Sequence, residues 1–250
     1  MIHTPRLSPE GTRVAYGRDH DVWIQDLERG VESRASFDAG HDIASLCWTP
    51  DGRFLTYTSG FGERNAIYQL DTLEPGEPNL LLRDEGAVLS VGSWSGDGRV
   101  LLFMKSQPDD YRPDLWTFSL DDGTSRVFLA SEFSEIAPEL PPDGRFVAFL
   151  SNETGRFEFY RRRFPEGGPR IPVSRDGAVG ARWSPDGTRL WYWNNEAMFE
   201  ATVGSGREPF AGQPALLFEG DYPHLDSVRV RGFDYSQRKD AFLLLGVVGP

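Results

Sequence analysis

Apolar and polar positions along the chain repeat a pattern of short strand-like segments separated by tight turns. The clearest copy is Ala181 to Trp193, ARWSPDGTRLWYW, in which one apolar segment ends at Trp183 and the next begins at Leu190. Between them, the sequence Ser-Pro-Asp-Gly predicts a turn, because proline fixes φ at about −65° and glycine accepts a positive φ without steric penalty. Such a turn between two apolar runs is typical of a β-hairpin.

The same turn recurs along the chain. Copies begin at residues 8, 49, 95, 141 and 184, and a degenerate sixth begins at 236, so most spacings lie in the forties. A unit of this length with four strand-like segments is typical of a propeller blade, since it cannot bury both faces alone and must stack on its neighbours. We therefore expect structural turn residues at Asp51, Gly52, Asp97, Gly98, Asp143, Gly144, Asp186 and Gly187.

The repeat predicts a single all-β domain over residues 1–250, a six-bladed β-propeller of four-stranded antiparallel blades with the last blade incomplete. The blades are expected at about residues 1–37, 38–83, 84–130, 131–174, 175–218 and 219–250. The last range supplies only two strands. We expect that the sequence is a piece of a longer chain, because a two-stranded last blade would expose a strand edge beside the first. Trp48, Trp94 and Trp183, each directly before a turn, are expected to wedge between adjacent blades.

Composition and charge narrow the class. Of the 250 residues, 39% are hydrophobic and 13% aromatic, which is ample for a core, while 27 glycines and 18 prolines interrupt apolar runs too early for most amphipathic helices. The net charge of −12 argues against nucleic acid as a partner, because binding phosphate needs a basic surface. A protein or peptide partner, preferably a basic one, and a monomeric state are expected.

Neither export nor membrane insertion is predicted from the sequence as written. The start, MIHTPRLSPEG, lacks a basic segment followed by an apolar one, and the longest apolar stretch, 241–248, is less than half of the roughly 20 residues that a spanning helix needs. A cytoplasmic location is expected on this basis. The single cysteine, Cys47, lies in an apolar segment and is interpreted as a buried structural thiol.

No catalytic, metal or cofactor site is predicted. The nearest approach to a nucleophile elbow, Gly92 to Gly96, has Trp94 where serine is required. The four histidines follow no metal-ligand spacing, and the carboxylates of Asp109, Asp110 and Asp114 are better interpreted as a solvated loop than as a cation site.

The repeat resembles that of TolB-like β-propellers, relatives of the WD-repeat propellers, over essentially the whole chain. The second half, in FVAFLSNETGRFEFYRRRF at 146–164, IPVS at 171–174, ARWSPDGTRLWYW and PALLFEG at 214–220, is similar to the propeller at the carboxyl end of bacterial serine/threonine protein kinases. That resemblance implies a sensory or docking module and an extracytoplasmic location if the parent is a membrane-anchored kinase. The chain departs from the family in containing no kinase signature.

The order of strands in a meander predicts where binding occurs. The regular turns share one face, so the variable loops on the opposite face, at the mouth of the central channel, are the candidates for recognition. The candidate binding residues there are His41, Asp42, Asp84, Glu85, Glu135, Arg175, Asp221 and His224. The function favoured is a non-catalytic binding or scaffold module for a protein or peptide. The alternative is a propeller that gates or assists an enzyme, a serine hydrolase or a kinase, whose catalytic domain lies outside this sequence.

Overall fold

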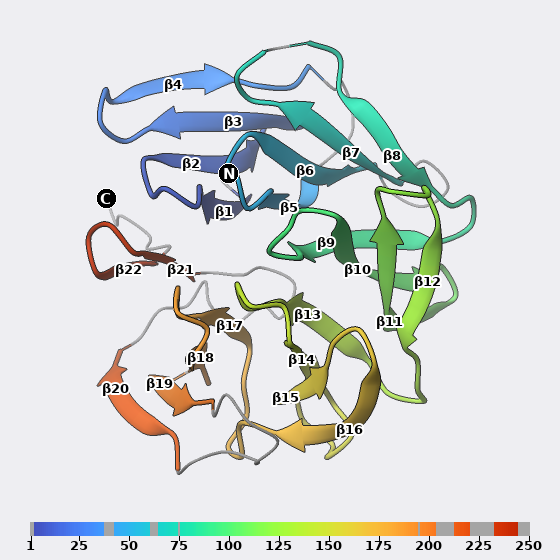
Figure 1. The fold of residues 1–250 in the computed structure, drawn as a ribbon, viewed down its shortest axis with the longest axis vertical. Helices are drawn as coiled ribbons and strands as arrows, with labels where there is room; N and C mark the ends of the chain where they lie inside the picture. Colours follow the sequence, from blue (N-terminus) through green and yellow to red (C-terminus); the bar gives the residue numbers. More distant parts are fainter. Residues whose placement is uncertain are drawn as a thin grey trace.

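The computed structural model describes residues 3–37, 43–60, 65–74, 76–194, 196–203, 213–220 and 233–244. These residues form five four-stranded sheets and one two-stranded sheet, and no helix occurs among them. Figure 1 shows the sheets arranged radially as the blades of a ring, with the first strand of each nearest the centre. The predicted all-β propeller with four-stranded antiparallel blades is confirmed. The described residues hold five such blades rather than six, followed by a two-stranded sheet.

Each sheet is a simple meander in which consecutive strands pair antiparallel. Blade 1 contains β1 (His3–Leu7), β2 (Arg13–Arg18), β3 (Asp21–Asp26) and β4 (Val31–Arg34), and blade 2 contains β5 (Ile43–Trp48), β6 (Phe54–Ser59), β7 (Ala66–Asp71) and β8 (Asn79–Arg83). Blade 3 contains β9 (Val88–Trp94), β10 (Val100–Gln107), β11 (Asp110–Ser119) and β12 (Ser125–Leu129), and blade 4 contains β13 (Glu135–Glu139), β14 (Phe146–Ser151), β15 (Glu158–Arg163) and β16 (Gly167–Pro172). Blade 5 contains β17 (Gly180–Trp183), β18 (Arg189–Trp193), β19 (Ala197–Thr202) and β20 (Ala215–Glu219), and the last sheet contains β21 (Phe233–Ser236) and β22 (Ala241–Leu244).

The turns after the first strand of each blade have the geometry that their residues favour. Gly52, Gly98, Gly144 and Gly187 have φ of 68°, 70°, 63° and 67°. The preceding aspartate accepts a hydrogen bond from the backbone two residues later, as Asp186 Oδ1 does from Thr188 N at 3.0 Å. A hydroxyl at the first turn position donates to the same carboxylate where one is present, at 2.5 Å for Ser184. The local sequence therefore closes each hairpin without help from other blades.

The apolar core lies between neighbouring blades. Separate clusters of buried side chains join blade 1 to blade 2, blade 2 to blade 3, blade 3 to blade 4, blade 4 to blade 5, and blade 5 to the two-stranded sheet. The predicted tryptophan wedges are confirmed: Trp48 Nε1 donates to the carbonyl of Arg6 and Trp183 Nε1 to the carbonyl of Glu139, both at 3.1 Å. Trp94 Nε1 donates to Thr56 Oγ1 at 3.0 Å. Each bond crosses from one blade to the preceding one.

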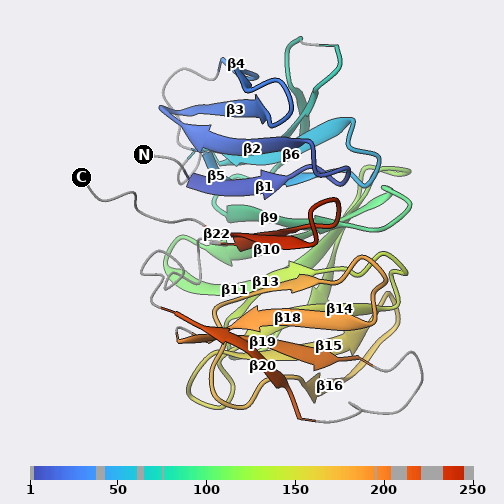
Figure 2. The same ribbon diagram turned by 90° about the vertical axis from the view of Figure 1, so that its left-hand side faces the viewer.

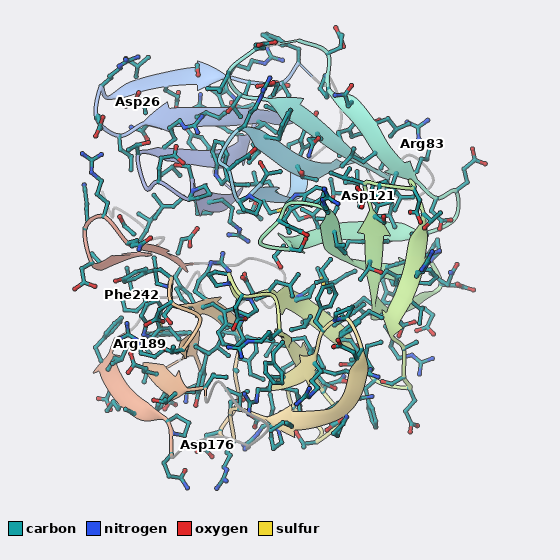
Figure 3. The ribbon with its side chains drawn as sticks, in the orientation of Figure 1. Asp26, Arg83, Asp121, Asp176, Arg189 and Phe242 are labelled. Carbon is teal, nitrogen blue, oxygen red and sulfur yellow. The ribbon has the colours of Figure 1, made fainter. Side chains whose placement is uncertain are left out.

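The two-stranded sheet lies between blade 5 and blade 1, and its contacts with these two blades differ in kind. The two-stranded sheet packs on blade 5 through aromatic rings, with Phe242 5.3 Å from Trp191 and 5.9 Å from Phe218 between ring centroids (Figure 3). On its other side β21 adjoins β1. The described contacts on this side are a hydrogen bond and an ion pair: Leu7 N donates to Asp234 Oδ2 at 2.9 Å, and Arg238 pairs with Glu28. The closing contact is thus held by charged and polar groups.

Candidate functional site

The propeller has two faces, seen edge-on in Figure 2. Because every blade is an antiparallel meander, the connections between first and second and between third and fourth strands share one face, here called the turn face. The remaining connections, within blades from second to third strand and between successive blades, share the other, here called the loop face. The described part of the loop face includes residues 84–87, 107–110, 130–134, 152–157 and 173–179.

Four of the eight candidate binding residues, His41, Asp42, Asp221 and His224, lie outside the described residues. Of the others, Asp84 pairs with Lys105, while Glu85 and Arg175 are exposed. Glu85 belongs to the connection between blades 2 and 3, and Arg175 to that between blades 4 and 5. No described contact joins the side chains of Asp84, Glu85 and Arg175, so these three charged groups do not form one site.

Glu135 does not lie on the surface. Its side chain is fully buried, and its Oε1 accepts hydrogen bonds from Ser131 Oγ at 2.8 Å and from Arg170 Nη1 at 2.9 Å. Arg170 also pairs with Glu153 at 2.6 Å. Burial raises the pKa of the Glu135 carboxyl, and these two partners oppose that rise. The expectation that Glu135 meets a partner at the mouth is corrected: it braces the loops of blade 4 from inside, because Arg170 from the outer strand reaches in to neutralise it.

Exposed carboxylates of the loop face were only partly anticipated. Asp109, at the tip of the β10–β11 hairpin, and Glu132, before β13, are exposed and make no ion pair with any described residue, as is also true of Glu85. Asp176 projects from the outer edge of the ring (Figure 3), with its side chain 91% exposed, and lies 3.7 Å from Arg156. Strand parity predicted that the second-to-third-strand connections lie on this face, but Asp109 in one of them was interpreted as part of a solvated loop and not as a binding residue.

A pocket of about 500 Å³ adjoins Arg175 on the loop face of blade 4, lined by Thr154, Gly155, Arg156, Glu158, Tyr160, Pro172, Ser174 and Arg175. Glu158 is buried there and accepts hydrogen bonds from Arg156 Nε at 2.6 Å and from Gly177 N at 2.9 Å. Burial, together with the Glu153 carboxylate, raises the pKa of Tyr160 to about 12. These polar groups are already paired, so the pocket is a preformed concavity rather than a reactive centre.

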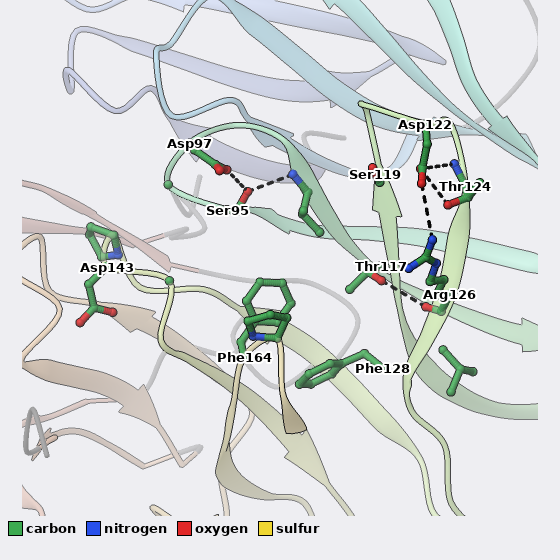
Figure 4. Close-up of a pocket in the computed structure, with 16 residues that line it drawn as sticks. Ser95, Asp97, Thr117, Ser119, Asp122, Thr124, Arg126, Phe128, Asp143 and Phe164 are labelled. Atoms are coloured by element: carbon green, nitrogen blue, oxygen red, sulfur yellow. Dashed lines mark hydrogen bonds and ion pairs between the residues drawn. The ribbon is translucent and has the colours of Figure 1, made fainter. Parts of the chain in front are cut away.

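A second pocket, of about 680 Å³, lies on the turn face between blades 3 and 4 (Figure 4). Sequence reasoning treated this face as closed. The turns do close each hairpin, but the crevice between two neighbouring hairpins stays open beside Pro142 and Phe164. The repeat describes each blade and carries no signal for the space between two of them.

A layer of polar side chains near the ring centre was also missed. It occupies the position two residues before each turn on the innermost strands: Arg6, Cys47, Ser93, Glu139, Arg182 and Asp234. Arg182 is buried and pairs with Glu139 of blade 4 and with Asp234 of the last sheet, Nε to Oδ1 at 3.0 Å. Burial alone would lower the pKa of Arg182, but Glu139 and Asp234 outweigh it and raise the pKa. Cys47 is buried, as predicted.

These groups provide no recognisable catalytic or metal centre in the part of the chain that the structure describes. No three His, Cys, Asp or Glu side chains there are grouped to hold a metal ion. Asp110, one of the three carboxylates weighed as a possible cation site, forms an ion pair with Arg112 at 2.7 Å. Among the described residues, no helix has the length and apolarity needed to cross a membrane.

No protein-family model matches the chain. It is 24% identical over 207 residues to the uncharacterized protein Atu1656 of Agrobacterium fabrum, covering 79% of this chain and 67% of that protein. It is 29% identical over 108 residues to the Tol-Pal system protein TolB of Anaeromyxobacter dehalogenans, covering 41% of this chain and 25% of that protein. Against the uncharacterized peptidase YuxL of Bacillus subtilis it is 26% identical over 161 residues, covering 60% and 22% respectively. The chain thus spans only about a quarter of the latter two proteins.

Solved structures give a closer match in shape. The putative TolB from Agrobacterium tumefaciens superposes with a TM-score of 0.67 at 17% identity, covering 88% of this chain and 81% of that one. TolB from Acinetobacter baumannii gives 0.66 at 19% identity over 86% and 57%. A chain of the nidogen/laminin complex gives 0.65 at 14% identity over 83% and 78%. Likeness at such identities shows the fold alone. This chain has the TolB-like β-propeller fold.

Proposed function

We propose that this chain is a non-catalytic binding propeller that recognises a basic protein or peptide segment at its loop face. The observation that carries the proposal is the set of exposed carboxylates there, Glu85, Asp109 and Glu132, which make no ion pair with a described residue. The nearby guanidinium of Arg112 is held by Asp110 and by the backbone carbonyl of Glu132. A partner's lysine or arginine would supply the missing counter-charge, and the net charge of −12 would draw it in over a distance.

The scaffold supports this role. Loops on a rigid framework keep their side chains in place without losing much freedom on binding, and here every blade is tied to the next by a buried apolar cluster. The loops of blade 4 are held further by two buried carboxylates: Glu135 accepts a hydrogen bond from Arg170, and Glu158 accepts one from Arg156. The names of the similar proteins agree with binding: one belongs to the Tol-Pal system, and one chain was solved in the nidogen/laminin complex.

The experiment is a selection of peptides from a random display library, followed by titration of the best binder at two salt concentrations. We expect lysine and arginine to be enriched and the Kd to rise as salt screens the exposed charges. The triple variant Glu85→Lys, Asp109→Lys and Glu132→Lys should weaken binding by about ten-fold or more. The matched control, Glu74→Lys, Glu77→Lys and Asp121→Lys, makes the same change of net charge on the turn face and should alter the Kd by less than about two-fold.

Two results would refute the proposal: selected peptides without a positive bias, or equal losses in the two triple variants. The aspartates of the turns are unsuitable as controls, because Asp51, Asp97 and Asp186 hold turn hydrogen bonds and their replacement would disturb folding.

A second candidate is the propeller part of a larger enzyme. The similarity to the peptidase YuxL favours it, since 60% of this chain aligns with only 22% of that protein. The sequence resemblance also implies that the larger enzyme could be a protein kinase, and this stays a prediction. Reading the open reading frame on both sides of this sequence tests both: a G-x-S-x-G elbow or a kinase signature in the flanking sequence would support an enzyme parent.

A further inference from the structure

The pocket between blades 3 and 4 on the turn face combines an apolar floor with an acidic rim. Its floor includes Phe128 and Phe164, whose ring centroids lie 5.6 Å apart, together with Val100 and Pro165 (Figure 4). Phe128 is only half-buried, so part of this apolar surface is open to a ligand. A floor of this kind favours an aromatic or aliphatic side chain.

Among the residues that line the pocket, the rim contains three carboxylates and one cation. The carboxylates are those of Asp97, Asp122 and Asp143, and the cation is Arg126. Asp143 pairs with Arg145 at 2.6 Å, and Asp122 lies 3.5 Å from Arg126, whose side chain is 76% exposed. Asp97 has no ion pair among the described residues and accepts hydrogen bonds from Ser95 Oγ and Arg99 N. Hydrogen bonds from Ser95 and Thr124 lower the pKa values of Asp97 and Asp122 respectively.

The floor and the rim require different parts of a ligand. The guanidinium of Arg162 from blade 4 already lies over the Phe128 ring, 5.4 Å from its centroid. A ligand cation at the floor would therefore be repelled by the positive charge of Arg162. The floor is therefore suited to an uncharged apolar group and the rim to a cation. A peptide segment that places an apolar residue next to an arginine or lysine meets both requirements at once.

We infer that this groove is a second docking site, separate from the loop face, for a peptide segment in which an aromatic or large aliphatic residue adjoins a basic one. The groove is formed where blades 3 and 4 meet, and the glycine at position 96 permits their turns to approach closely, since a Cβ there would lie 2.4 Å from the carbonyl oxygen of Pro142. Its location on the opposite face would let the propeller hold two partners at once.

The test uses the full chain and three blocked pentapeptides: one with phenylalanine between two arginines, its isostere with citrulline for both arginines, and a version with glycine for phenylalanine. Isothermal titration of each measures Kd. We expect saturable binding of the first peptide, and a weakening of about ten-fold or more for each of the other two, since each loses one half of the recognition.

The decisive variant is Arg126→Glu, which removes the competing cation from the rim and adds a carboxylate. It should tighten binding of the arginine peptide by about five-fold, a gain that misfolding cannot produce. The control is Arg29→Glu, an exposed arginine of blade 1 that lies away from the groove, and its effect should stay within about two-fold. Thr117→Arg, which introduces bulk and positive charge into the groove, should weaken binding by about ten-fold.

The inference is overturned if the arginine peptide shows no saturable binding, if the citrulline peptide binds equally well, or if Arg126→Glu and Arg29→Glu act alike. The loop-face triple variant separates the two sites: it should leave this affinity unchanged. A large loss in that variant would place the peptide on the loop face instead and would also overturn the inference, while leaving the proposed function intact.

Discussion

Gly96 shows how one residue departs from the repeat for a physical reason. The other four regular turns have proline at this position, at Pro9, Pro50, Pro142 and Pro185. Gly96 does not have a positive φ, so turn geometry does not require glycine. It is required by space, since a Cβ would lie 2.4 Å from the Pro142 carbonyl oxygen of the next blade.

Replacing Gly96 with alanine should therefore destabilise the protein by about 1–3 kcal/mol, because the backbone of blade 4 must shift to make room. The change is measured as a lower urea midpoint of unfolding. Gly76→Ala is the control, since its Cβ would meet nothing closer than 4.0 Å and its φ is not positive. Equal urea midpoints for Gly96→Ala and Gly76→Ala would contradict this, because they would show that blades 3 and 4 can move apart at Gly96 without a cost in stability.

Gly187 tests the turn itself. Its φ is 67°, a region that β-branched residues avoid. Gly187→Val should lower the free energy of unfolding by about 1–3 kcal/mol, while Gly187→Asn should lose less, because asparagine tolerates the left-handed region. The comparison of the two denaturation midpoints checks the conformational cause. If valine and asparagine were equivalent, the turn would have relaxed to another conformation.

The turn aspartates make the free energy of unfolding depend on pH in the acidic range. The hydrogen bond from Ser184, and then those from Thr188, lower the pKa of Asp186 from its ordinary 3.8 to about 2. Since the folded pKa lies below the unfolded one, this stabilisation is complete above about pH 4 and is lost as the pH falls toward 2. The carboxylate is exposed, so screening by solvent keeps the effect small.

Asp186→Asn should accordingly reduce the slope of unfolding free energy against pH between pH 4 and 2, measured by urea denaturation at several pH values. Asp121→Asn serves as control, because Asp121 makes an exposed ion pair with Arg99 and no described turn hydrogen bond. A slope unchanged in Asp186→Asn, or reduced equally in both variants, would contradict this origin.

At the scale of elements, the two-stranded sheet closes the ring through Asp234. One carboxylate oxygen accepts from Leu7 N of blade 1 at 2.9 Å and the other from Arg182 Nε of blade 5 at 3.0 Å. A single side chain thus ties the first and fifth blades through β21. Its partner Arg182 is buried, so the loss of the charge would leave a guanidinium only partly compensated by Glu139.

Asp234→Ala should destabilise by up to about 3 kcal/mol and speed amide exchange in β1 and β21 before the other strands. Asp234→Asn keeps an acceptor for Leu7 N but removes the charge, so its loss should be intermediate. The measurement is hydrogen–deuterium exchange of the two variants beside the unchanged protein. Uniform acceleration in all blades would mean that closure does not depend on this residue.

The sequence predicted the elements that local chemistry determines. The turns at 49–52 and 184–187, the strands beside them and the tryptophan wedges follow from turn residues and short apolar runs, which act over a few positions. Strand ends are less predictable from the apolar pattern: β11 begins at Asp110, before the apolar residues Leu115 and Trp116, and β16 begins at Gly167, before Ile171. There, polar residues extend the hairpins beyond the apolar pattern.

Features that depend on two distant segments could not be predicted. The burial of Glu135 depends on Arg170 reaching it from another strand, and the clasp at Asp234 depends on residues of the first and fifth blades. The groove between blades 3 and 4 is likewise a product of packing. Sequence periodicity places each residue within its own blade but does not specify what it meets across the gap to the next blade.

At the scale of the whole molecule, the protein is a ring of blades with two chemically different faces and a net charge of −12. The loop face has exposed carboxylates that make no described ion pair, and the described part of the turn face has regular hairpins and the groove between blades 3 and 4. A basic protein or peptide segment is therefore expected to dock on the loop face, while the blades beneath it change little on binding.

The most direct test of this claim is hydrogen–deuterium exchange with and without the tightest basic peptide from the library selection. We expect slower exchange in residues 84–87, 107–110 and 130–134 on the loop face, and no change in the turns at 49–53 and 184–188. Slower exchange confined to the turn face, or spread evenly over all five blades, would contradict it.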